Sequence, residues 1–126
     1  MKIATNIVAG LLGFVFIAIS LMVLLGLAPK PEIPEGTPAW HFMSAFVPTG
    51  YLTMVKIFEL IGGCLVVVPR TRNLGLLVLG PIVLNILAYH ILIMQGKGLV
   101  GPPLLVAVLA LFLLWAERKA FAGLIK

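Results

Sequence analysis

Long apolar runs separated by short polar stretches dominate the chain. A helix that crosses a membrane needs about 20 mostly apolar residues, and four runs approach or exceed this length. Between the first two runs, four prolines in ten residues prevent a regular helix over residues 29–38. The runs cover residues 3–28, 51–68, 74–94 and 99–116. The pattern predicts an all-α integral membrane protein, in which residues 1–126 form one domain, a bundle of four transmembrane helices.

A shorter aromatic segment follows the Pro-rich stretch, over residues 39–47. It is too short to cross a bilayer, and its Trp40 is typical of residues near lipid headgroups. We interpret the segment as an interfacial or re-entrant element over the outer end of the bundle. This placement would bring His41 near the mouth of a site between the helices.

Composition excludes other classes of protein. The chain has 62% hydrophobic and 10% charged residues, whereas soluble domains have about 45–50% and about 25%. The apolar excess excludes a disordered chain, and the single cysteine, Cys64, excludes a disulfide scaffold. The net charge of +5 is not gathered on a soluble face. We therefore expect the lipid bilayer as a partner and no nucleic acid.

The positions of Lys and Arg predict the orientation. Four helices place both termini on one side, and cytoplasmic loops carry the excess of basic residues. One side holds Lys30 and Lys97. The other side holds Lys2, Arg70, Arg72, Arg118, Lys119 and Lys126. The distribution predicts that both termini are cytoplasmic and that the Pro-rich loop is outside.

Lys56 and Glu59 lie inside the second predicted span, where an ionisable group costs about 2.5–3.5 kcal/mol. Their spacing of three residues puts both side chains on one face of a helix. Two interpretations stay open. The residues form an ion pair that makes insertion tolerable, or Glu59 faces a polar cavity where it exchanges protons or binds a ligand. The sequence does not fix the protonation state of Glu59.

The third predicted span also carries polar residues, namely Asn85, Tyr89 and His90. At 1.5 Å per residue in antiparallel helices, Asn85 lies at the depth of Glu59. By the same count His90 lies at the depth of Lys56. These residues predict a ligand or proton site in the outer half of the bundle. Their structural alternatives are an interhelical hydrogen bond for Asn85, an interfacial anchor for Tyr89 and a packed ring for His90.

Gly62, Gly63 and Pro81 have structural roles in this interpretation. Adjacent glycines allow close packing of helices, whereas Pro81 removes one backbone hydrogen bond from the third span and can kink it. No ligand spacing supports a metal site, and no motif for covalent attachment of a cofactor is present. We therefore expect neither a metal nor a covalently bound cofactor, and we assign no catalytic residue.

Three groups of residues resemble the DoxX-like family of small four-helix bacterial membrane proteins. They are Lys56-x-x-Glu59-x-x-Gly62-Gly63, the basic turn Pro69-Arg70-Thr71-Arg72, and Pro81-x-x-x-Asn85-x-x-x-x-His90. The resemblance implies a place in the bacterial inner membrane. It also implies an association with membrane redox chemistry, including quinone-linked thiosulfate oxidation and oxidant-defence complexes.

The function implied by the resemblance is an accessory or quinone-contacting subunit of a membrane oxidoreductase system. Lys56 or His90 would donate to a quinone carbonyl, and Glu59 would relay a proton. A redox partner protein would supply electrons, and a homo-oligomer is compatible with this function. One alternative is a structural or assembly protein with no chemistry of its own. Another is a small proton-coupled transporter, although in small multidrug exporters the membrane glutamate usually lies in the first helix.

Overall fold

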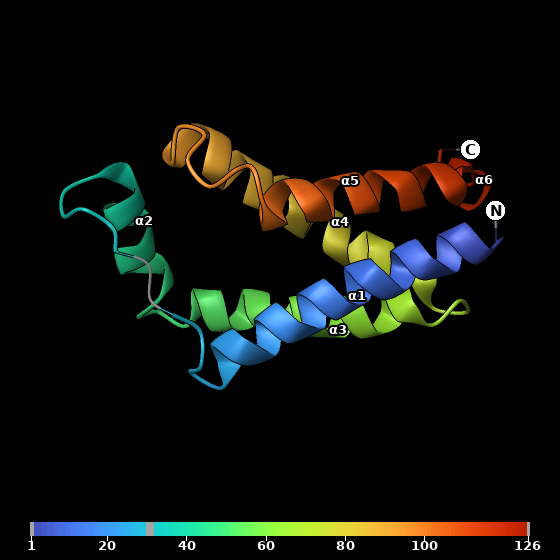
Figure 1. Ribbon diagram of the computed structural model, residues 1–126, viewed down its shortest axis with the longest axis horizontal. Coiled ribbons are helices and arrows are strands. Elements are labelled where there is room, and N and C mark those ends of the chain that lie inside the picture. The colour runs from blue at the N-terminus through green and yellow to red at the C-terminus, as the bar shows by residue number, and fades with distance from the viewer. Residues whose placement is uncertain (1, 30–31, 126) are drawn as a thin grey trace.

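The computed structural model describes residues 2–29 and 32–125, and every regular element in these ranges is a helix (Figure 1). Lys30 and Lys126, which contribute to the predicted orientation, lie outside the described residues. The elements are α1 (Lys2–Leu24), α2 (Pro38–Phe46), α3 (Tyr51–Val67), α4 (Arg72–Ala88), the π-helix η1 (Tyr89–Ile93), α5 (Pro102–Ala116) and α6 (Arg118–Ala122). The all-α class predicted from the sequence is therefore confirmed.

Four helices pack in a closed arrangement in which each contacts the next. α1 packs on α3, α3 on α4, α4 on α5, and α5 again on α1. Successive helices run in opposite directions, so the start of α1 and the end of α5 lie at the same end of the molecule (Figure 1, right). α2 lies at the other end, outside the four-helix arrangement.

Two helices within the described residues are long and apolar enough to cross a membrane, namely α1 and the continuous helix Arg72–Ile93. α2 and α3 make a third candidate if they form one broken span, with a bend of 79° between them. α5 is apolar but has 15 residues, which is short of the usual length of about 20. The structure therefore has two or three candidate spans, and the predicted four are not established.

The outward faces of the helices are apolar. Phe14 on α1, Leu84 on α4 and Leu111 on α5 have exposed fractions of 68%, 68% and 65%. Soluble monomers rarely expose broad apolar surfaces to water. A lipid bilayer would cover such surfaces at no cost, so this feature agrees with a membrane protein.

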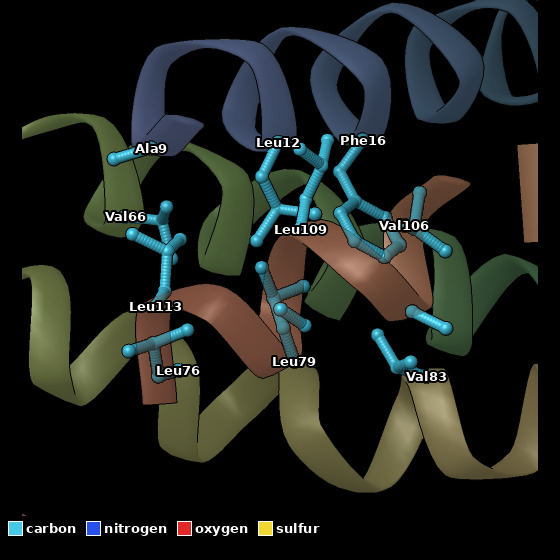
Figure 2. Close-up of a cluster of buried hydrophobic side chains, with 12 residues drawn as sticks. Ala9, Leu12, Phe16, Val66, Leu76, Leu79, Val83, Val106, Leu109 and Leu113 are labelled. Carbon is cyan, nitrogen blue, oxygen red and sulfur yellow. The ribbon is translucent and has the colours of Figure 1, made fainter. Parts of the chain in front are cut away.

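The hydrophobic core lies between the four helices, and Figure 2 shows most of its side chains. The buried members are Ala9, Leu12, Phe16, Val66, Leu76, Leu79, Val83, Val106, Ala107, Leu109, Ala110 and Leu113. Most of them belong to the parts of the helices nearer the termini. The candidate site lies in the other half of the bundle.

Glycines set how closely α3 approaches its two neighbours. A Cβ atom on Gly63 would lie 3.1 Å from the carbonyl oxygen of Gly13 in α1. A Cβ atom on Gly62 would lie 2.7 Å from the side chain of Leu79 in α4. The two adjacent glycines therefore serve different contacts, with Gly63 against α1 and Gly62 against α4.

Two helix boundaries differ from the predicted spans, and glycine or proline marks each difference. α1 ends at Leu24 rather than near residue 28, because Gly26 has a φ of 74° and closes the helix with a Schellman motif. α5 begins at Pro102 rather than at residue 99, and Gly101 before it has a φ of 141°. Proline is favoured in the first turn of a helix, where its missing N–H leaves no hydrogen bond unmade.

Candidate functional site

A cavity of about 960 Å³ lies between α3 and the helix formed by α4 and η1, and α2 contributes part of its wall. Its volume is in the range of small-molecule sites, about 300–1,000 Å³. Apolar side chains form most of the wall. The polar residues on it are Glu32, Thr49, Tyr51, Lys56, Glu59, Asn85, Tyr89 and His90. The structure thus brings together five of the six predicted ligand-site residues, all except His41.

Lys56 and Glu59 form an ion pair on the wall of the cavity. The Lys56 Nζ lies 3.2 Å from the Glu59 Oε1, and the side chains are 15% and 3% exposed. No other ion pair within 4.0 Å occurs in residues 2–29 and 32–125. The three-residue spacing on α3 aligns the two groups on one helix face. A charged pair in an otherwise apolar wall offers both hydrogen-bond donors and a carboxylate to a molecule in the cavity.

Ser20 of α1 places a hydroxyl beside the Glu59 carboxyl. The residue is fully buried, and its Oγ has no hydrogen-bond partner among the described residues. The sequence alone does not mark Ser20 as a site residue, because a lone serine in an apolar helix commonly bonds to the backbone of its own helix. Here the hydroxyl is left available to the carboxyl group.

Asn85 contributes to the wall from α4, but it does not form the interhelical hydrogen bond considered as its structural role. Its Nδ2 donates to the carbonyl oxygen of Pro81, at 2.8 Å, within the same helix. The carbonyl four residues earlier is the nearest acceptor for a short polar side chain on a helix. Pro81 does not interrupt α4, which continues as a helix to Ala88.

His90 and Tyr89 lie in η1, where the helix widens into a π turn. The His90 Nδ1 lies 2.8 Å from the carbonyl oxygen of Ile86. Because a carbonyl oxygen can only accept, Nδ1 carries a proton and donates this hydrogen bond. Short π-helical turns are frequent at functional sites. Nothing in the sequence marks this turn, so it could not be predicted.

Five aromatic rings form a continuous series along the wall of the cavity. The series runs from Tyr51 through Phe46, Phe42 and Tyr89 to His90. Consecutive ring centroids are 4.7, 4.8, 4.9 and 5.1 Å apart. These distances are typical of favourable aromatic pairs. The series joins the start of α3 to η1 through α2, and it gives the cavity flat apolar surfaces.

α2 matches the predicted short element over residues 39–47, but His41 does not line the cavity. Thr37 caps α2 by accepting a hydrogen bond from the Trp40 backbone N–H, at 3.3 Å. The helix directs Phe42 and Phe46 to the cavity, whereas His41 is exposed and packs edge-on against Trp40. Within the described residues, no group of three His, Cys, Asp or Glu side chains could hold a metal ion.

Comparison with known proteins gives one similarity. The chain is 29% identical over 100 residues to the "Uncharacterized protein YwoB" of Bacillus subtilis (strain 168). The match covers 76% of this chain and 63% of that protein, so the chain spans less than two thirds of its relative's length. No family model and no solved structure matches the chain. The resemblance to the DoxX-like family therefore stays a prediction.

Proposed function

We propose that this chain is a four-span membrane protein that binds a quinone between α3 and α4. In this proposal it is a DoxX-like accessory subunit of a membrane oxidoreductase system in the bacterial inner membrane, with both termini in the cytoplasm. The observation that carries the proposal is the buried Lys56–Glu59 pair on the wall of an apolar, aromatic cavity. Such a wall suits a flat apolar molecule with a few polar atoms.

The four-span part of the proposal is supported by the closed packing of α1, α3, α4 and α5. With 17 and 15 residues, α3 and α5 would reach about 25 and 22 Å at 1.5 Å per residue. A bilayer accommodates helices shorter than its hydrocarbon thickness by local thinning. The cytoplasmic placement is supported by Arg72, Arg118 and Lys119, which line one cavity at the end where the termini lie.

The residues of the cavity fit a quinone ring. Phe42 and Tyr89, whose ring centroids are 4.9 Å apart, would pack together against one face of the quinone ring. The Lys56 ammonium would donate to one of its carbonyl oxygens. An ammonium has three N–H groups, of which Glu59 accepts one, so donors remain for a ligand. The bound quinone would supply reversible two-electron, two-proton redox chemistry.

The chain itself would bind, orient and move a proton. Glu59 would take up or release the proton at its carboxyl group, beside the Ser20 hydroxyl and the Lys56 ammonium. The apolar side chains around them would exclude water from the pair. Electrons would come from a redox partner protein in the same membrane.

One observation favours a second function. Lys56 and Glu59 already satisfy one another, as a pair 3.2 Å apart, and this alone is sufficient to make both tolerable in a bilayer. A structural or assembly protein would need nothing more from them. The two functions differ in whether the cavity binds a ligand.

Binding of a short-chain ubiquinone to the purified full chain in detergent, measured by calorimetry, tests the proposal. We expect Lys56→Gln to weaken binding about 10-fold, because glutamine replaces a charged donor, whose hydrogen bond is worth about 1.5–3 kcal/mol, by a neutral donor worth about 0.5–1.5 kcal/mol. Lys97→Gln is the matched control, since Lys97 does not line the cavity. A melting curve for each variant checks folding. Equal affinity in the native chain and both variants would overturn the proposal.

A further inference from the structure

A second cavity, of about 640 Å³, lies at the end of the bundle where both termini lie. Its wall comes from the first turns of α1, the turn between α3 and α4, and the junction of α5 with α6. No residue lines both cavities. The quinone proposal therefore does not involve the second cavity. A ligand proposed for the second cavity can be tested independently of the quinone.

The wall of this second cavity is strongly basic. It holds the cationic side chains of Lys2, Arg72, Arg118 and Lys119, with Glu117 as its carboxylate. None of these five belongs to an ion pair within 4.0 Å in the part of the chain that the structure describes. The wall of the second cavity therefore carries an excess of positive charge, which favours the binding of an anion.

Arg72 is held rigidly in this wall. The residue is 4% exposed, and its guanidinium donates to the last carbonyl groups of α3, from Nε to Val66 at 3.0 Å and from Nη2 to Val67 at 3.4 Å. The final carbonyls of a helix have no partner within the helix, and a cation there is stabilised by the helix dipole. Two of the five N–H groups are used in this way, so three remain for a ligand.

Arg118 is positioned by a different contact. Its guanidinium carbon lies 4.6 Å from the centroid of the Trp115 ring, and its Nη1 donates to the Trp115 carbonyl oxygen at 2.7 Å. Tryptophan is enriched at the level of lipid headgroups. Two guanidinium groups are thus fixed before any ligand arrives, and their planar geometry suits the paired oxygens of a phosphate group.

We propose that this cavity binds the phosphodiester headgroup of an anionic phospholipid. The apolar outer face of α1 begins beside it, where Ile3 and Ile7 are 76% and 58% exposed, and this face would contact the acyl chains. Basic pockets between helices on the cytoplasmic side of a membrane are typical sites for anionic headgroups. A free phosphate would share the cationic contacts but would leave the adjacent apolar surface unused.

The test compares the lipids that remain bound to the purified full chain by native mass spectrometry, after exchange into equal amounts of phosphatidylglycerol and phosphatidylcholine. The double variant Lys2→Gln/Lys119→Gln removes two cations from the wall and keeps the two arginines. We expect its preference for phosphatidylglycerol to fall about 30-fold, which corresponds to about 1 kcal/mol for each lysine. A melting curve confirms that the variant is folded.

The matched control is Arg70→Gln/Lys97→Gln, which removes two cations that do not line the cavity. We expect it to keep the native preference. An equal loss in both double variants, or no preference in the native chain, would overturn the proposal. A second arm titrates the lipid-free chain with inorganic phosphate and follows ³¹P resonances. Phosphate binding that Lys2→Gln/Lys119→Gln abolishes, without a preference for phosphatidylglycerol, would identify a soluble phosphate and overturn the lipid as its source.

Discussion

At the scale of single residues, the Lys56–Glu59 pair has the largest electrostatic consequence. Glu59 is almost completely buried, at 3% exposed, whereas Lys56 is 15% exposed and carries a longer side chain. Removing one partner of a buried pair leaves a charge without compensation. A lysine can extend its ammonium towards water, but a buried glutamate cannot do so. The two single substitutions should therefore have unequal effects.

We expect Lys56→Met to lower the free energy of unfolding by about 3 kcal/mol, because it leaves the buried Glu59 carboxyl unpaired. Glu59→Gln should cost less, since Lys56 can still reach the surface. The double variant Lys56→Met/Glu59→Gln should regain most of the lost stability. Thermal melting of the four chains in one detergent gives the comparison.

The same four chains separate the structural from the functional role of the pair. The double variant should be stable but should not regain affinity for a quinone, because its methionine cannot donate a hydrogen bond. If the double variant binds quinone like the native chain, the pair serves only insertion and packing.

Some cavity residues could be singled out from the sequence because their type is unusual for their surroundings. Lys56, Glu59 and Asn85 stand out in apolar helices, and all three line the cavity. His41 and Ser20 could not be placed in this way. The direction of His41 depends on how α2 docks, and the contact of Ser20 depends on the packing of α1 on α3. Both are tertiary features that no local pattern encodes.

At the scale of helices, glycines decide which faces of α1, α3 and α4 meet. Gly13 lies against α3, where an added Cβ would collide with the Val67 side chain and lie 2.8 Å from the Gly63 carbonyl oxygen. Gly10, one turn away on the same helix, has nothing within 4 Å of an added Cβ. The two positions therefore make a matched pair for testing the packing.

Gly13→Ala should destabilise the chain by about 1–3 kcal/mol, because the backbone of α3 must move away. Gly10→Ala should be neutral or stabilise by up to about 1 kcal/mol, since alanine is the better helix former. Thermal melting of each variant measures the difference. Equal melting temperatures would show that α1 and α3 do not meet at Gly13.

Helix positions could be predicted from apolar runs, and some of the helix ends from glycine and proline. Gly26 marks the end of α1, and Pro102 marks the start of α5. The apolar runs extend beyond both helix ends, because leucine and valine also occur outside the helices, next to this glycine and this proline. The π turn of η1 differs. It adds one residue to a helical turn without a characteristic residue, so its cause lies in the packing around it.

At the scale of the whole molecule, the two ends of the bundle differ in chemistry. One end holds the basic cavity beside the termini, and the other holds the aromatic cavity beneath α2. This difference between the two ends supports the proposed orientation, with both termini in the cytoplasm, because basic residues are retained on the cytoplasmic side. The uneven distribution of basic residues along the chain could be predicted from the sequence. That four of them line one cavity follows only from the structure.

Cysteine labelling tests the orientation. In a Cys64→Ala background, Glu35→Cys should react in intact cells with a maleimide that does not cross membranes. Lys119→Cys should react only after the cells are opened, because the positive end should remain inside. Labelling of Lys119→Cys in intact cells, with protection of Glu35→Cys, would reverse the proposed orientation.

The most direct measurement of the central claim is photo-cross-linking of the native chain in lipid with a photoreactive quinone, followed by peptide mapping. We expect the label on residues 42–46 and 89–94, displaced by unlabelled quinone, and reduced by Lys56→Gln but not by Lys97→Gln. Label spread over lipid-facing side chains such as Phe14 and Leu111, without displacement by unlabelled quinone, would contradict a quinone site between α3 and α4.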